Sequence, residues 1–137
     1  MDGSQNAQLN HLLITIGRSL LQYVGESWPW TSEDSDEARR KLTELVDRQQ
    51  QSVGALASLL NAREWAIDFG TYPTDYTDLH FIALDFLLAQ LVENQEAVVD
   101  VLKQSAELNG DGEASQLMAG IVEAESAILS ELQLLEP

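Results

Sequence analysis

The stretch 91–102, LVENQEAVVDVL, shows the amphipathic pattern from which the fold is predicted. Its apolar residues recur at steps of three and four, which places them on one face of a helix rather than on a strand. Gln95 lies on that same face, with apolar residues three and four positions away on both sides: Leu91, Val92, Val98 and Val99. The stretch therefore predicts a helix whose buried face is interrupted by a single polar side chain.

Four segments of the chain show this amphipathic pattern, and no segment shows the strict alternation of a half-buried strand. We expect helices over about residues 6–28, 35–66, 77–109 and 113–135, separated at Pro29, at Gly70 and Pro73, and at the turn 109–112. Four such helices bury their apolar faces best against one another. The sequence predicts a single all-α domain over residues 1–137. We expect an antiparallel four-helix bundle of two helical hairpins, joined by a longer crossover near residues 69–76.

The other predicted helices carry the same kind of interruption. Gln49 and Glu125 each have apolar residues three and four positions away, and Ser19 has a similar place on the first helix. We expect Ser19, Gln49, Gln95 and Glu125 to meet at the middle of the bundle, because a buried polar group without a partner costs about a few kcal/mol. Burial should also raise the pKa of Glu125. This layer is interpreted either as structural hydrogen bonding or as a site for a cation or a small molecule.

Two helical hairpins, a longer crossover and polar residues at the middle of the bundle resemble the ferritin-like superfamily. In that superfamily two helices each supply a Glu to a pair of irons or manganeses, and the other two each supply a Glu-x-x-His. The resemblance places these ligands at Ser19, Gln49-x-x-Ser52, Gln95 and Glu125-x-x-Ile128. Glu125 is the one carboxylate present, and both histidines are missing. The resemblance therefore implies a member without the di-metal ligands, and hence no metal and no cofactor.

The composition limits the partners. The chain has 23 acidic and 7 basic side chains and a formal net charge of −16. Phosphates repel such a surface, which argues against nucleic acid and against an anionic membrane. No apolar run approaches the ~20 residues of a membrane span, and residues 1–10 do not have the pattern of a signal peptide. We therefore expect a cytoplasmic protein that does not bind membranes.

Few residues suit catalysis. The chain has no cysteine, and His11 and His80 are its two histidines, each expected at a helix end or on the surface. Neither a Gly-x-Ser-x-Gly elbow nor a glycine-rich phosphate loop occurs. The sequence thus favours a non-catalytic binding or interaction module over an enzyme. The alternative is a ferritin-like metal-binding or oxidoreductase protein whose displaced site draws on Asp47, Glu93, Glu96 and Glu125.

Two further features concern partners. From residue 104 to the end the chain has seven acids and no lysine or arginine. This acidic face is compatible with a basic protein partner, or with a homodimer in which it pairs with the basic start of the second helix, Arg39–Lys41. The aromatic residues near the connections are expected to form a hydrophobic plug at one bundle end, or else an exposed partner patch: Trp28, Trp30, Trp65, Tyr72 and Tyr76.

Overall fold

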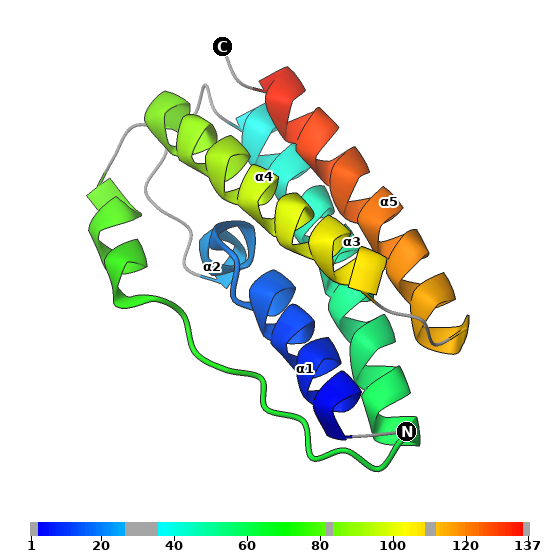
Figure 1. The fold of residues 1–137 in the computed structure, drawn as a ribbon. Coiled ribbons are helices and arrows are strands. Elements are labelled where there is room, and N and C mark those ends of the chain that lie inside the picture. The colour runs from blue at the N-terminus through cyan, green and yellow to red at the C-terminus, as the bar shows by residue number, and fades with distance from the viewer. Residues whose placement is uncertain (1–2, 27–35, 82–83, 109–111, 136–137) are drawn as a thin grey trace.

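The computed structural model describes residues 3–26, 36–81, 84–108 and 112–135, and all regular structure in these ranges is helical (Figure 1). The α-helices are α1 (Gly3–Gly17), α2 (Leu20–Glu26), α3 (Asp36–Ala62), α4 (Leu84–Leu108) and α5 (Gly112–Leu135), and the 3₁₀ helix η2 spans Thr74–Phe81. The predicted all-α class is confirmed for this part of the chain. None of its helices combines the length and the apolar character that crossing a membrane requires.

The long helices pack side by side around a common core. α3 contacts α1, α2 and α5, and α4 contacts the same three helices. The core consists of two clusters. The first hydrophobic cluster joins α1 to the later halves of α3 and α4 and the start of α5, and it includes Leu12, Leu60, Leu102 and Met118. The second hydrophobic cluster joins α2 to the earlier halves of α3 and α4 and the end of α5, and it includes Leu21, Leu45, Leu91 and Leu132.

The prediction of one continuous first helix is wrong, because the chain breaks at Arg18 and Ser19 between α1 and α2. Gly17 favours a break because glycine is a poor helix former. The start of the second segment is capped from a distant helix, since the backbone N–H of Leu20 donates to Asn94 Oδ1 at 3.0 Å. The break turns both Ser19 and the following segment toward the centre of the molecule. Residues 27 and 28 of the predicted helix lie outside the described residues.

The predicted second helix also ends earlier than expected, at Ala62 rather than near residue 66. Glu64 adopts a left-handed backbone with φ of 58°, and the N–H of Trp65 returns to the carbonyl oxygen of Leu60 at 3.0 Å. This is the hydrogen-bonded helix ending that ordinarily has glycine at the left-handed position. The ending directs the chain away from α3 and across the outside of α1.

Glu64→Gly is expected to raise the free energy of unfolding by about 0.5–1 kcal/mol, since glycine adopts this φ without steric cost. Glu64 is exposed, so its side chain contributes little packing. Urea unfolding of the wild type, Glu64→Gly and Glu64→Ala tests this expectation. The alanine variant removes the carboxylate but keeps the unfavourable φ, so equal stabilisation by both variants would contradict the explanation.

Residues 63–73, here called the strap, connect α3 to η2 along the outside of α1 (Figure 1). The side chain of Asn10 donates to the carbonyl of Asp68 at 2.7 Å and accepts from the N–H of Asp68 at 2.9 Å. Arg18 Nε donates to the carbonyls of residues 69 and 70. Gly70 has φ of 69°, and a Cβ there would lie 2.8 Å from the side chain of Ile14. The close approach to α1 therefore requires glycine.

The third predicted helix begins later than expected. The sequence placed its start near residues 77–78, but η2 spans these positions and α4 begins at Leu84. Local bonds favour the tighter 3₁₀ turn: the N–H of Tyr76 donates to the carbonyl of Pro73, and Thr77 Oγ1 donates to that of Thr74. The predicted turn at 109–112 falls mostly outside the described residues, which resume at Gly112.

The described aromatic residues do not form the single plug that was predicted. Trp65 packs against the first hydrophobic cluster, whereas Tyr76 packs against the second. Tyr23 of α2 contacts both Tyr72 and Tyr76, with ring centroids 5.2 and 5.5 Å away. Trp65 and the tyrosines around Tyr23 thus belong to different parts of the core. Trp28 and Trp30 lie outside the described residues.

Candidate functional site

Six buried polar side chains lie between the two hydrophobic clusters, and together they are called the polar layer: Ser19, Gln22, Gln49, Ser52, Gln95 and Glu125. They come from the α1–α2 break, α2, α3, α4 and α5, so every long helix except α1 contributes directly. Each is at most 5% exposed. The four residues that the sequence singled out all lie in this layer and share one hydrogen-bond network.

Gln49 on α3 is the centre of that network. Its Oε1 accepts from Ser19 Oγ at 2.9 Å and from Gln22 Nε2 at 3.0 Å. Its Nε2 donates to Gln95 Oε1 at 3.1 Å and to Glu125 Oε1 at 2.7 Å. One amide thereby links the α1–α2 region, α3, α4 and α5, and all its hydrogen-bonding groups have partners.

Glu125 on α5 is a fully buried carboxyl group with neutral neighbours. Besides the bond from Gln49, its Oε1 accepts from Gln95 Nε2 at 3.1 Å, and its Oε2 accepts from Ser52 Oγ at 2.9 Å. No lysine or arginine among the described residues forms an ion pair with it. Desolvation raises the pKa of Glu125 above its ordinary value of 4.5, and the three hydrogen bonds and the charge of Arg48 oppose that rise.

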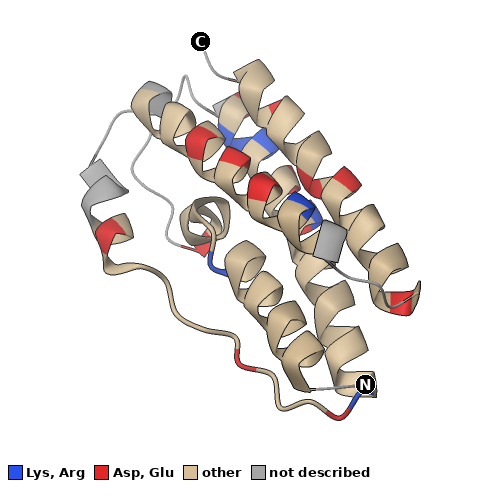
Figure 2. Ribbon diagram, in the orientation of Figure 1, with Lys and Arg blue, Asp and Glu red and all other residues tan. Residues whose placement is uncertain are grey.

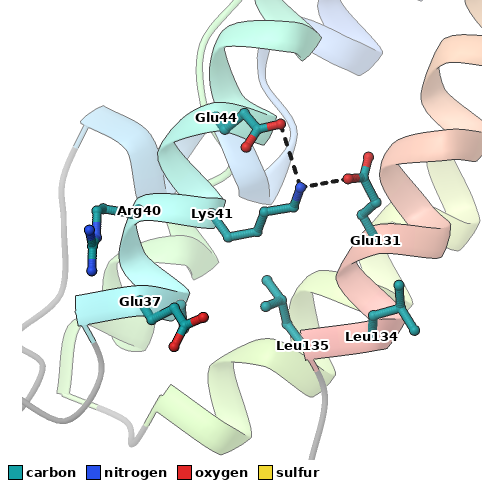
Figure 3. Close-up of a pocket in the computed structure, with 8 residues that line it drawn as sticks. Glu37, Arg40, Lys41, Glu44, Glu131, Leu134 and Leu135 are labelled. Atoms are coloured by element: carbon teal, nitrogen blue, oxygen red, sulfur yellow. Dashed lines mark hydrogen bonds and ion pairs between the residues drawn. The ribbon is translucent and has the colours of Figure 1, made fainter.

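An ion-pair cluster joins α3 and α5 outside the core. Lys41 Nζ lies 2.6 Å from Glu131 Oε1, and Arg48 pairs with the other oxygen of Glu131 and with Glu44. Hydrogen bonds from Lys41 and then Arg48 lower the pKa of Glu131. Lys41 and Glu131 line an open pocket beside the exposed Leu134 (Figure 3). Part of the basic start of α3 is thus paired with α5 within one chain, whereas the pairing predicted for a homodimer was between subunits.

Charge is unevenly distributed over the helices. Figure 2 shows basic residues concentrated on the first half of α3, and acidic residues along α4 and α5. Four of the seven basic residues lie in α3: Arg39, Arg40, Lys41 and Arg48. Of the two histidines, His11 is exposed on α1, and His80 lies in η2 with a side chain outside the described set.

The donors in the polar layer do not suit a metal ion. Gln49, Gln95 and Ser52 all present hydrogen atoms to Glu125, whereas a cation needs oxygen or nitrogen lone pairs. Ile128, at one predicted histidine position, belongs to the second hydrophobic cluster. In the part of the chain that the structure describes, no three residues of His, Cys, Asp or Glu gather as a metal site would require.

The chain matches no protein-family model, and searches of the curated proteins and of the solved structures found no match.

Two members of the polar layer were not predicted as members, although their spacing carries a signal. Gln22 follows Ser19 by three positions and Ser52 follows Gln49 by three, so each lies one helical turn from a predicted member. In the ferritin-like resemblance Ser52 occupies the position of a missing histidine. The burial of Gln22 does not follow from the sequence pattern, because the break at Ser19 changes which side of the following segment faces inward.

Proposed function

We propose that this protein is a non-catalytic binding or interaction module built on a ferritin-like antiparallel four-helix bundle. In this proposal a hydrogen-bonded layer stands where related bundles hold two metal ions. The observation that carries it is the environment of Glu125, which accepts three hydrogen bonds from Gln49, Gln95 and Ser52. These bonds satisfy the carboxylate without a cation.

The directions of the helices support the ferritin-like arrangement. In Figure 1, α3 and α4 run in one direction while α1 and α5 run in the other. Every packed pair of long helices is then antiparallel: α1 with α3, α3 with α5, α5 with α4, and α4 with α1. Two helices of the same direction that follow one another, α3 and α4, need a long crossover, and the strap with η2 supplies it.

The positions of the polar layer support the same arrangement. The resemblance placed the ligand positions at Ser19, Gln49, Gln95 and Glu125, and these four side chains meet in one network. A carboxylate at each of these positions would converge on one point between the helices. Three of the positions hold an amide or a hydroxyl instead. Their hydrogen bonds fix the register of the helices.

The alternative of a displaced carboxylate site receives less support. Asp47, Glu93 and Glu96 are exposed, whereas Glu125 is fully buried. These carboxylates therefore do not share a site in this arrangement of the helices. A partner is better sought on the surface, where Leu134 is 84% exposed beside the ion-pair cluster. A basic protein fits the excess of 23 acids over 7 basic residues, whereas a second copy of the chain would instead bury Leu134 as an apolar contact.

Metal analysis tests the proposal. Purified protein is incubated separately with Fe(II) under anaerobic conditions, with Mn(II) and with Co(II), then desalted and examined by elemental analysis. We expect no stoichiometric metal with any of the three ions. About two ions per chain, the content of a di-metal bundle, would overturn the proposal. Loss of those ions in Glu125→Gln but not in Glu123→Gln, an exposed position on the same helix, would assign them to the polar layer.

A further inference from the structure

Glu125 is the single ionisable side chain of the polar layer. The proposed function does not draw on its ability to bind and release a proton. Its surroundings are neutral on every packed side: Gln49 and Ser52 on α3, Gln95 on α4, and Ser19 and Gln22 behind Gln49. Arg48 on α3 is the charged group that acts on it, and that guanidinium is paired with Glu131 and Glu44. The acids of α4 at this level, Glu93 and Glu96, are exposed.

The two oxygens of this carboxyl group differ in what they can bind. Oε1 faces two N–H donors, from Gln49 at 2.7 Å and from Gln95 at 3.1 Å. An amide N–H has no lone pair, so a proton on Oε1 would find no acceptor there. Oε2 faces the hydroxyl of Ser52 at 2.9 Å, and a hydroxyl both donates and accepts. A proton is therefore accommodated on Oε2 alone.

Ser52 has somewhere else to direct its hydrogen. When Oε2 is ionised, Ser52 donates to it across the 2.9 Å between the two oxygens. When Oε2 carries a proton, Ser52 accepts that proton's hydrogen bond and rotates its own hydrogen away. That hydrogen then points toward the groove between α3 and α5 that Ser52 lines. The hydroxyl therefore pairs with Oε2 in both protonation states of Glu125.

Ser52 lies at the edge of the polar layer and is 5% exposed. It lines a groove of about 360 Å³ between α3 and α5. The small residues Ala55, Gly120 and Ala124 line the same groove, and a Cβ added at Gly120 would meet nothing within 4 Å. The groove therefore lies on the Ser52 side of the pair, and Glu125 itself is fully buried and does not line it.

From this geometry we propose that Glu125 is a reversible proton-binding site at the centre of the bundle, with the Ser52 hydroxyl as its switch, and that it links solution pH to the stability of the α3–α4–α5 packing. The site works with or without a partner protein, so it stands independently of the proposed interaction role. Protonation removes a buried charge, while ionisation places one among neutral donors.

The sign of the pH dependence follows from burial. Desolvation raises the pKa of Glu125 in the folded protein above the ordinary value of 4.5. The stabilising contribution of this group is then fully present below about pH 4.5 and is lost as the pH rises through the folded-state pKa. Acidification through the folded-state pKa of Glu125 therefore stabilises the packing around it.

Thermal unfolding of the wild type, Glu125→Gln and Glu123→Gln between pH 4 and pH 8 tests the linkage. Each variant lacks a single acid of the wild type, so its difference from the wild type isolates one carboxyl group. We expect the Tm of the wild type to fall relative to that of Glu125→Gln as the pH rises. The Tm difference between the wild type and Glu123→Gln should change less over the same pH range. A constant difference between the wild type and Glu125→Gln would overturn the proposal.

NMR titration of the Glu125 side-chain carboxyl carbon in the wild type tests the site directly and needs no variant at this position. We expect a reversible titration in the folded protein with a midpoint above the ordinary value of a glutamate. Ser52→Ala removes a donor to the ionised form and should move the midpoint further upward. A wild-type midpoint at or below the ordinary value refutes the proton site, and an unchanged or lower midpoint in Ser52→Ala refutes the role of Ser52.

Discussion

Gln49→Leu is expected to lower the free energy of unfolding by about 4 kcal/mol, the largest effect of a single substitution in the polar layer. The leucine has a similar volume, so little of this loss comes from a cavity. It comes from hydrogen bonds: Ser19 and Gln22 lose their acceptor, and Gln95 and Glu125 lose a donor. Each buried group left without a partner costs about 1–3 kcal/mol, and a charged one costs more.

Urea unfolding at pH 7 measures this loss, and Gln50→Leu is the matched control. Gln50 is the next residue on α3 but is exposed, so the same chemical change there should alter the stability by less than about 0.5 kcal/mol. A loss below about 1 kcal/mol in Gln49→Leu would mean that the network contributes little to stability.

Asn10→Ala is expected to lower the free energy of unfolding by about 2–3 kcal/mol and to loosen the strap. The side chain of Asn10 is 6% exposed and satisfies both the N–H and the C=O of Asp68, 58 positions away. Alanine would leave both backbone groups without their partners, at about 1–3 kcal/mol each when buried. The expected loss of stability stays below the largest sum of these two costs. The pair is only part-buried, so water can replace some of the lost hydrogen bonds.

Two measurements separate loosening of the strap from general destabilisation. Urea unfolding gives the total loss, and amide hydrogen exchange at residues 65–70 reports local opening. Asn61→Ala removes the same side chain from an exposed position on α3 and is the control. Unchanged exchange at the N–H of Asp68 in Asn10→Ala would contradict the role assigned to Asn10.

The helices and the polar layer were predictable because both depend on spacing along one element. Apolar steps of three and four around Gln49, Gln95 and Glu125 put the three side chains on the buried face of their helices. Since each helix has one such position near its middle, the positions meet when the helices pack. The same spacing, extended by one turn, indicates Ser52 as well.

The features that were missed depend on contacts between distant segments. The break before α2 relies on Asn94, which caps Leu20 from 74 positions away. The course of the strap relies on Asn10 and Arg18 of α1, which bind backbone groups of residues 68–70. No local pattern records such pairs, because each partner alone is an ordinary polar residue. The end of α3 was misplaced because a non-glycine residue, Glu64, takes the left-handed position.

The polar layer has a consequence for how the chain folds. Its hydrogen bonds come from four separate parts of the sequence, and Gln49 needs partners from three of them at once. A partly assembled species, such as α3 docked on α5 without α4, would bury Glu125 with one amide donor missing. Such intermediates have a higher free energy than both the unfolded chain and the complete bundle. Folding is therefore expected to be a cooperative, all-or-none process.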